Sequence, residues 1–404
     1  MRISTSTLYT DNIATMNTLQ AQIATTQQQI STGRRILNPA DDPSAAARAV
    51  EVAQSDASNT QYADNRTAAI NTLSLSEGIM QSVTSLMQDV RIVALDAGNS
   101  LLTDSSRKAL ASDLQGRLDE LLGLANSTDG KGNYLFSGAQ GKVKPFVDTV
   151  AGVTYQGDDM QRKVQASAAR QISATDAGSD IFMRIRSGNG VFHAARDAAN
   201  TGDATITQGT LLDASLYNGE SYRVVFTSAT TYDINDVTAG LPGTAVVSGA
   251  TYADGQAISV NGIQFEIKGT PANGDIFDIT PSANQSAFTT IQNLIDTLNA
   301  SIPSTNAMTS AAYRQGLNEA LASIDQGLNT VLGVRATMGS RLNELDALQF
   351  TGEELGLQFK QTLSKLQDTD YNKAISELSM QNLMLQASQQ SFAKVSQLSL
   401  FNYI

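Results

Sequence analysis

Apolar residues at heptad spacing occur near both ends of this 404-residue chain, and they constrain its fold more than any other feature. Near the N-terminus the stripe consists of Met16, Leu19, Ile23, Ile30 and Leu37, with Thr26 and Gly33 at the intervening positions. Such spacing predicts an amphipathic helix that pairs with another helix along one face. Because two seam positions are weak, we expect this helix to be marginal without a partner.

The C-terminal part of the chain repeats this pattern over a longer distance. Apolar residues return near Phe288 and keep a three-four alternation at Leu317, Leu321, Ile324, Leu328, Val331, Met338, Leu342 and Leu345. We expect Leu328 and Leu342 to be buried within this stripe. The segment Asp368–Asp370 predicts a cap before a last helix. The predicted interface residues of that helix are Leu378, Leu385, Phe392 and Leu398.

Two prolines interrupt the first helical pattern, at Asn38-Pro39 and Asp42-Pro43. Aspartate is a favoured N-cap, and proline suits the first position of a helix, where its missing N–H is not needed. Asp41, Asp42 and Pro43 are therefore predicted to form a linker and helix cap, with Arg34 or Arg35 as the partner of the carboxylates.

Further helices are predicted on both sides of a short break. A long helix should run from about Pro43 to about Ala97, because apolar residues keep helical spacing there. The stop signal Gly98-Asn99 follows, and Thr103 can cap a third helix.

The helical period is absent from the middle of the chain. Tyr134–Gly138 and Val153–Tyr155 predict short strands. Between about Thr175 and Ser282, alternating or β-branched segments such as Ile263–Ile267 predict a β-rich domain. The dipeptide Asn261-Gly262 is a strong signal for a two-residue hairpin turn.

These patterns together predict an α+β fold, in which the N- and C-terminal segments form a long α-helical coiled-coil bundle with an inserted β-rich domain. The expected domains are an N-terminal coiled-coil assembly helix (1–40), a helical domain with a β-hairpin (41–174), an inserted outer β-rich domain (175–284), the C-terminal part of the helical domain (285–350) and a C-terminal coiled-coil assembly helix (351–404).

Composition excludes several classes of function. The net charge is −12, and Arg34-Arg35 is the only basic doublet, so the chain lacks the clustered cations that a nucleic-acid site needs. No stretch approaches the ~20 apolar residues of a membrane span. The first residues carry no apolar run typical of a cleaved signal peptide. We therefore expect no nucleic-acid partner and no membrane partner.

Residues for catalysis are scarce. The sequence has no cysteine and one histidine, His193, so a histidine-based triad or a multi-histidine metal site cannot form within one chain. Asp129–Asn133 lacks the ligand series of a calcium loop and is interpreted as a turn. The sequence therefore predicts no enzyme activity, no catalytic residue, no cofactor and no metal.

The two incomplete amphipathic ends predict self-association. Exposed apolar helix faces usually mark association sites. The simplest arrangement is that the ends pair with each other and with copies of the same chain. A head-to-tail contact that does not close into a ring generates an open helical array.

Several blocks of sequence point to a known family. They are Met1–Thr7, Arg35–Pro43, Tyr134–Gly138, Tyr155–Asp158 and Ile375–Ile404. In this order they resemble flagellar hook–filament junction proteins, also called hook-associated protein 3, of the flagellin superfamily. Pro43, directly after the paired aspartates, is more similar to the junction proteins than to flagellin.

The resemblance implies an extracellular structural subunit of the bacterial flagellum, which joins hook to filament and templates flagellin assembly. It also implies type III export without a cleaved signal peptide. The implied partners are the hook-side junction protein, flagellin and an export chaperone at the C-terminal helix. Flagellin itself, the bulk filament subunit, is the main alternative, and a surface adhesin on a helical stalk is another.

Overall fold

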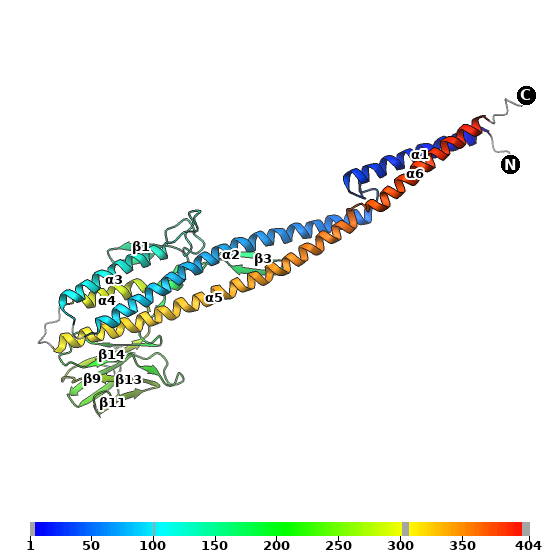
Figure 1. The fold of residues 1–404 in the computed structure, drawn as a ribbon. Helices are drawn as coiled ribbons and strands as arrows, with labels where there is room; N and C mark the ends of the chain where they lie inside the picture. The colour runs from blue at the N-terminus through cyan, green and yellow to red at the C-terminus, as the bar shows by residue number, and fades with distance from the viewer. Residues whose placement is uncertain (1–4, 100–101, 301–306, 398–404) are drawn as a thin grey trace, which may run out of the picture. The chain divides into compact units, whose positions relative to one another are not determined.

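The computed structural model describes residues 5–99, 102–300 and 307–397 (Figure 1). The helices in these residues are α1 (Thr5–Thr32), α2 (Pro43–Ala97), α3 (Asp104–Ala125), α4 (Ala287–Asn299), α5 (Ala307–Gln367) and α6 (Tyr371–Gln397). The chain divides into two compact units, of which the second is Asn65–Asp346 and the first contains the described residues on either side of it. Helices α2 and α5 contribute to both units.

Helices α2 and α5 run antiparallel in each unit. In the first, the side-chain amide of Asn59 donates to the carbonyl oxygen of Gly352 at 2.8 Å. In the second, Arg335 forms an ion pair with Glu77 at 2.7 Å. Higher-numbered residues of α2 therefore meet lower-numbered residues of α5. This is the arrangement expected for the two arms of a helical hairpin that are separated in sequence by a long insert.

The seam of the second unit is a regular heptad pattern. The buried residues of α2 recur every seven positions in two series, Leu73, Met80, Met87 and Ala94, and Ala69, Ser76, Val83, Val90 and Ala97. On α5 the buried series is Leu317, Ile324, Val331, Met338 and Leu345. A strict seven-residue repeat keeps one face of each helix toward its neighbours along the whole seam.

The sequence prediction for Leu328 and Leu342 is wrong, because both are only half-buried. The position beside the main series of α5 is instead filled by small buried residues, Ala320 and Gly327. A Cβ atom added to Gly327 would lie 2.8 Å from Cε of Met87 on α2. The small residue therefore lets α2 and α5 approach closely, and this approach moves the larger leucines to the flank of the seam.

Hydroxyl side chains cap the shorter helices of the second unit. Thr103 accepts a hydrogen bond from the backbone N–H of Ser106 at the start of α3, which confirms the predicted cap. Ser286 does the same for Thr289 at the start of α4. Each bond satisfies one of the backbone donors that a helix leaves free in its first turn. Helices α3 and α4 pack against each other.

Two β-hairpins accompany the helices of the second unit, whereas the sequence predicted one. They are β1 (Phe146–Thr149) with β2 (Gly152–Tyr155), and β3 (Lys163–Ser167) with β4 (Arg170–Ser173). The second hairpin is tied to α2, where Asn65 donates to the carbonyl of Gln165 and the buried Arg66 donates to that of Ala166. Its polar sequence gives no alternation from which it could be predicted.

The predicted strand at Tyr134–Gly138 is wrong. This segment forms turns with isolated bridges, Thr128 to Tyr134 and Ser137 to Ala177. Its consecutive residues Leu135 and Phe136 are both buried, whereas neighbouring side chains of a strand point to opposite faces.

The inserted segment folds into what we call the β domain, residues 185–285. Its strands are β5 (Ile185–Arg186), β6 (Phe192–Arg196), β7 (Thr205–Ile206), β8 (Thr210–Leu211), β9 (Tyr222–Ser228), β10 (Thr231–Asp236), β11 (Thr244–Thr251), β12 (Ala257–Val260), β13 (Ile263–Lys268), β14 (Ile276–Pro281) and β15 (Asn284–Gln285). A π-helical turn, η1 (Ser179–Met183), precedes it.

Two sheets enclose the core of the β domain. One has the order β11-β10-β9-β14-β6, and the other has the order β12-β13-β7, with β8 also paired to β13. Tyr222, Val224 and Phe226 alternate into the core from β9, as a half-buried strand requires. Asn261 and Gly262 both have positive φ, 41° and 83°, which confirms the predicted tight hairpin between β12 and β13.

The predicted α+β class is confirmed, whereas the compact units do not follow the predicted domain boundaries. The units divide α2 after Asp64 and α5 after Asp346, inside continuous helices. The predicted boundary at 40/41 came from the prolines that interrupt the first helical pattern. The division into an assembly helix at each end and a helical domain between them stays a prediction.

We expect the substitution Ile324→Asp to destabilise the second unit strongly. Ile324 is 0% exposed in the heptad seam, and an unpaired carboxylate there should cost about 3–5 kcal/mol. Leu332→Asp places the same group at a site that is 46% exposed on the same helix and serves as the control. Urea unfolding followed by circular dichroism measures both. Equal urea midpoints for the two variants would contradict the burial of Ile324 in the heptad seam.

Candidate assembly interface

Helices α1 and α6 of the first unit lie side by side and antiparallel (Figure 1). At one end the ring of Tyr9 meets that of Phe392 edge-on, with centroids 4.6 Å apart. At the other end the backbone N–H of Thr369 donates to the carbonyl of Gly33 at 2.9 Å. The first and the last described helices therefore form one helical pair.

The seam between α1 and α6 is covered less completely than the seam of the second unit. Its best-covered large apolar residues, Leu19 and Ile23, each keep 9% of their surface, whereas Leu73 in the second unit keeps none. Polar side chains also enter it. Thr26 is buried, and Oε1 of Gln381 is buried with no hydrogen-bond partner in the described part of the chain. An unsatisfied buried polar atom costs ~1–3 kcal/mol, so this pair is marginal by itself.

Most of the predicted interface residues lie in this seam within the chain. On α1 they are Met16, Leu19, Ile23 and Ile30, and on α6 they are Leu378, Leu385 and Phe392, all buried or half-buried. Leu37 is not on the helix, because α1 ends at Thr32 and Gly33 follows with a φ of 71°. Leu398 lies outside the described residues. These side chains are therefore largely used by the pairing of α1 with α6.

A different face of α6 stays uncovered. Met380, Leu383 and Met384 are 54%, 63% and 49% exposed, and Ala387 is also exposed. They occupy positions i, i+3, i+4 and i+7, which share one side of a helix. We call these four residues the α6 stripe. The sequence analysis missed it because the last helix has apolar residues on more than one face, and only the position of α1 separates the seam from the stripe.

The connections α1–α2 and α5–α6 are hydrogen-bonded to each other. Arg34 and Asp368 form an isolated antiparallel bridge, and the N–H of Arg35 donates to the carbonyl of Gln367 at 2.7 Å. The guanidinium of Arg35 also donates to the carbonyl of Leu366 at 2.9 Å. We call residues 33–42 with 366–370 the elbow. Because the two breaks are joined, α1 and α6 leave the long helices together.

The paired aspartates shape the first half of the elbow. Asp41 accepts hydrogen bonds from the backbone N–H groups of Leu37 and Asn38, at 3.0 and 2.8 Å. Asp42 accepts from the N–H of Ala45 at 3.0 Å and pairs with Arg35 at 3.3 Å. The N–H of Ala45, and to a smaller extent Arg35, lower the pKa of Asp42 below its usual value.

These interactions place Asp42 at the start of α2. Its carboxylate accepts the bond that an N-cap supplies, and Pro43 is the first residue of the helix. The second half of the elbow is built in the same way, because Asp370 accepts hydrogen bonds from the N–H groups of Asn372 and Lys373 at the start of α6.

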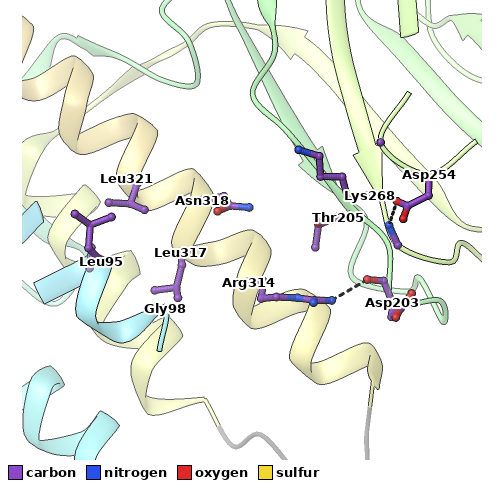
Figure 2. A pocket seen from close by; sticks show the side chains of 13 residues that line it. Leu95, Gly98, Asp203, Thr205, Asp254, Lys268, Arg314, Leu317, Asn318 and Leu321 are labelled. Carbon is purple, nitrogen blue, oxygen red and sulfur yellow. Dashed lines mark hydrogen bonds between the residues drawn. The ribbon is translucent and has the colours of Figure 1, made fainter. Parts of the chain in front are cut away.

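A cavity of about 560 Å³ lies in the second unit, between the β domain and the ends of α2 and α5 (Figure 2). Leu95, Leu317 and Leu321 form its apolar side, and Thr205 and Lys268 lie on the β-domain side. Nη2 of Arg314 donates to the carbonyl oxygen of Asp203 at 3.1 Å across the cavity.

The carboxylates of this cavity hold turns in place. Asp203 accepts hydrogen bonds from the hydroxyl and N–H of Thr270, which lower its pKa, and Asp254 accepts from the N–H of Gly269. A general acid needs a raised pKa, so Asp203 is poorly suited to that role. The geometry is that of a contact between domains.

Two kinds of site are absent from the described residues. In those ranges no three histidine, aspartate or glutamate side chains are grouped as a metal ion would need. None of the helices there is both long and apolar enough to cross a membrane.

The chain is similar to flagellar proteins along its whole length. A model of the bacterial flagellin N-terminal helical region matches residues 3–141, and a model of the flagellar hook-associated protein 1 D2-like domain matches residues 195–281. Flagellar hook-associated protein 3 of Salmonella typhimurium is 31% identical over 401 residues, which cover 99% of both chains. The protein of the same name from Escherichia coli gives the same values.

The chain belongs to the flagellar hook-associated protein 3 family. The resemblance predicted from the sequence is confirmed, and the chain is a flagellar component. Solved structures agree with this membership. Xanthomonas campestris FlgL has a TM-score of 0.71 at 34% identity, with 77% of this chain and 99% of that chain covered. The Legionella pneumophila flagellar hook-associated protein-3 has a TM-score of 0.72 at 31% identity, with 78% and 98% covered.

Flagellin gives a weaker match. The flagellin of Serratia marcescens is 24% identical over 382 residues, which cover 95% of this chain and 92% of the flagellin. Membership of the hook-associated protein 3 family therefore separates the chain from its main alternative, while both share the helical ends.

We expect Arg35→Met to loosen the elbow without unfolding the chain. The substitution removes the bond to Leu366 and the ion pair with Asp42, so amides of residues 33–37 and 366–370 should exchange severalfold faster. Hydrogen exchange read by mass spectrometry measures this. Arg34→Met is the control, because Arg34 contributes backbone bridging to the elbow. Similar exchange in both variants would contradict the role of the Arg35 side chain.

Proposed function

We propose that this chain is a structural subunit of the bacterial flagellum that forms the junction between hook and filament and templates flagellin assembly. The observation that carries the proposal is the 31% identity to flagellar hook-associated protein 3 over 99% of both chains. A related solved structure from Legionella pneumophila, 30% identical, is described as the flagellar junction protein FlgL. The protein acts through its surfaces and is not an enzyme.

The α1–α6 pair supplies a physical route to assembly. Its own seam is shallow and partly polar, and the α6 stripe is uncovered. Burying one Leu or Met side chain contributes ~1.5–3 kcal/mol, so a neighbouring subunit that covers the stripe stabilises both the contact and the helical pair. Repetition of such a contact by a rotation that does not close produces a helical array. Assembly and ordering of the ends are thereby coupled.

The elbow gives this contact a defined direction. Because both chain breaks are joined by backbone hydrogen bonds, α1 and α6 are presented as one body on α2 and α5. This supports the division in which residues 1–40 and 351–404 serve assembly, while residues 41–174, 285–350 and the inserted 175–284 form the remaining domains.

The partners follow from the position of a junction. One side of the array contacts the hook-side junction protein and the other contacts flagellin, while copies of the chain contact one another. The exposed α6 stripe would also need cover before assembly, which fits an export chaperone at the C-terminal helix. The protein is exported by the flagellar type III pathway and acts outside the cell.

Flagellin remains the second candidate, favoured by the 24% identity to the Serratia marcescens protein over most of both chains. The two functions differ in what the purified chain does. A filament subunit polymerises into long filaments, whereas a junction subunit forms only a short zone on a hook-side template. Electron microscopy of a motile strain without this gene separates them, because loss of the junction leaves hooks without filaments and releases intact flagellin into the medium.

We expect Leu383→Asp to block assembly while sparing the folded monomer. Leu383 is 63% exposed, so a charge there meets water in the monomer but would be buried under a neighbouring subunit. Complementation of the deletion strain, scored by filaments per hook, should fall at least tenfold, and the melting temperature should stay within about 1 °C. Gln386→Asp adds the same charge at an exposed polar position of α6 outside the stripe and should complement normally.

We expect Leu385→Asp to behave differently, because Leu385 lies in the seam with α1. The buried charge should separate α1 from α6 in the monomer, and amides of both helices should then exchange faster. If Leu383→Asp and Leu385→Asp loosen the monomer equally, the distinction between seam and stripe is wrong.

A further inference from the structure

The only histidine of the chain faces a polar cavity where the β domain meets the helices. His193 lies on β6 between Phe192 and Ala194, whose side chains enter the β-domain core. Alternation along the strand therefore directs His193 to the opposite side. There it lines a cavity of about 330 Å³ together with residues of α4 and α5. Its Nδ1 atom is buried and has no hydrogen-bond partner in the described part of the chain.

The helix side of this cavity carries a carboxylate connected to the β domain. Glu319 of α5 accepts a hydrogen bond from Nε2 of Gln315 at 2.8 Å. Oε1 of the same Gln315 accepts from the backbone N–H of Ile206 on β7 at 3.0 Å. Gln315 is buried, so these bonds form a protected link from β7 to Glu319. His193 and Glu319 thus face one cavity from the two sides of the contact.

The cavity lies beside the place where the chain enters and leaves the β domain. The short strands β5 and β15 pair there, and Gln285 of β15 also lines the cavity. Serine side chains support this connection, since Ser282 donates to the carbonyl of Ser187 and the hydroxyl of Ser187 accepts from the N–H of Ala283. A change in the cavity is therefore placed to alter how the β domain is held on α5.

We propose that His193 and Glu319 form a pH-dependent latch that holds the β domain against α5. In this partly dry site an ionised Glu319 is costly unless a proton or a facing cation compensates it, and His193 is the residue of the lining that can carry a positive charge. Once Glu319 loses its proton, the buried carboxylate lacks the compensation that the proton supplied. Asp296 of α4 adds a second negative charge and is the remaining titratable residue that lines the cavity.

The direction of the pH effect follows from Glu319. Burial raises the pKa of this carboxyl above its usual value, although the Gln315 hydrogen bond and the His193 charge oppose the change. The folded chain therefore holds the proton more tightly than the unfolded chain. The stabilisation is present at acid pH and is lost as the pH rises through the folded pKa.

Hydrogen exchange of the full-length chain tests the latch. After correction for intrinsic exchange rates, amides of residues 192–196, 206 and 315–323 should exchange severalfold faster at pH 8 than at pH 5.5. Glu319→Gln keeps the acceptor for Gln315 and removes the charge, so protection should stay high and independent of pH. His193→Gln removes the charge that opposes the rise of the Glu319 pKa, so the transition should move to higher pH.

Asp296→Asn is the matched control, since it neutralises a carboxylate at an exposed position on the rim of the same cavity. It should retain the wild-type transition. The proposal is overturned if the wild-type chain shows no change in these segments, or if Glu319→Gln shows the same change as the wild type. Because the chain contains no cysteine, spin labels on two introduced cysteines provide a second readout of the position of the β domain. Spin labels at Val246→Cys on β11 and Leu332→Cys on α5 should report a broader distance distribution at pH 8.

Discussion

The contrast between a closed and an open helical seam underlies the rest of the structure. In the second unit every seventh residue of α2 and α5 is buried, from Leu73 to Ala94 on one helix and from Leu317 to Leu345 on the other. That seam provides a fixed base for α3, α4, two hairpins and the β domain. Between α1 and α6 the seam has the same spacing but admits Thr26 and Gln381. The α1–α6 seam is therefore less completely covered than the seam of the second unit.

The elbow holds one end of the α1–α6 pair together, because it joins the connection after α1 to the connection before α6. Helix breaks usually introduce freedom, since a residue outside a helix loses its backbone partners. Here the backbone groups of the two connections pair with each other at the bridge between Arg34 and Asp368. Asp42 and Asp370 cap the helices that follow. In the proposed function, this joint presents the α6 stripe to a neighbouring subunit in a defined direction.

The sequence predicted that the terminal helices carry apolar seams, but it did not predict which face of α6 stays uncovered. Heptad spacing identified Leu19, Ile23 and Leu385 as members of a helical seam, and the structure places them there. The same spacing cannot say which helix covers which face. Met380, Leu383 and Met384 form the uncovered stripe because α1 occupies the other side of α6, and that position results from contacts between residues more than 300 apart in the chain. Leu37 was misplaced because Gly33 ends α1 one turn earlier than the pattern suggested.

The sequence by itself determined the helices, their caps, the hairpin at Asn261-Gly262 and the α+β class, because local backbone preferences and side-chain periodicity fix these features. Tertiary structure decided which leucines are buried. Gly327 lets α5 approach Met87, and this approach moves Leu328 to the flank. It also brought His193 and Glu319 to one cavity. Contacts between distant residues depend on how elements pack, and packing is a property of the whole set of side chains that no local pattern contains.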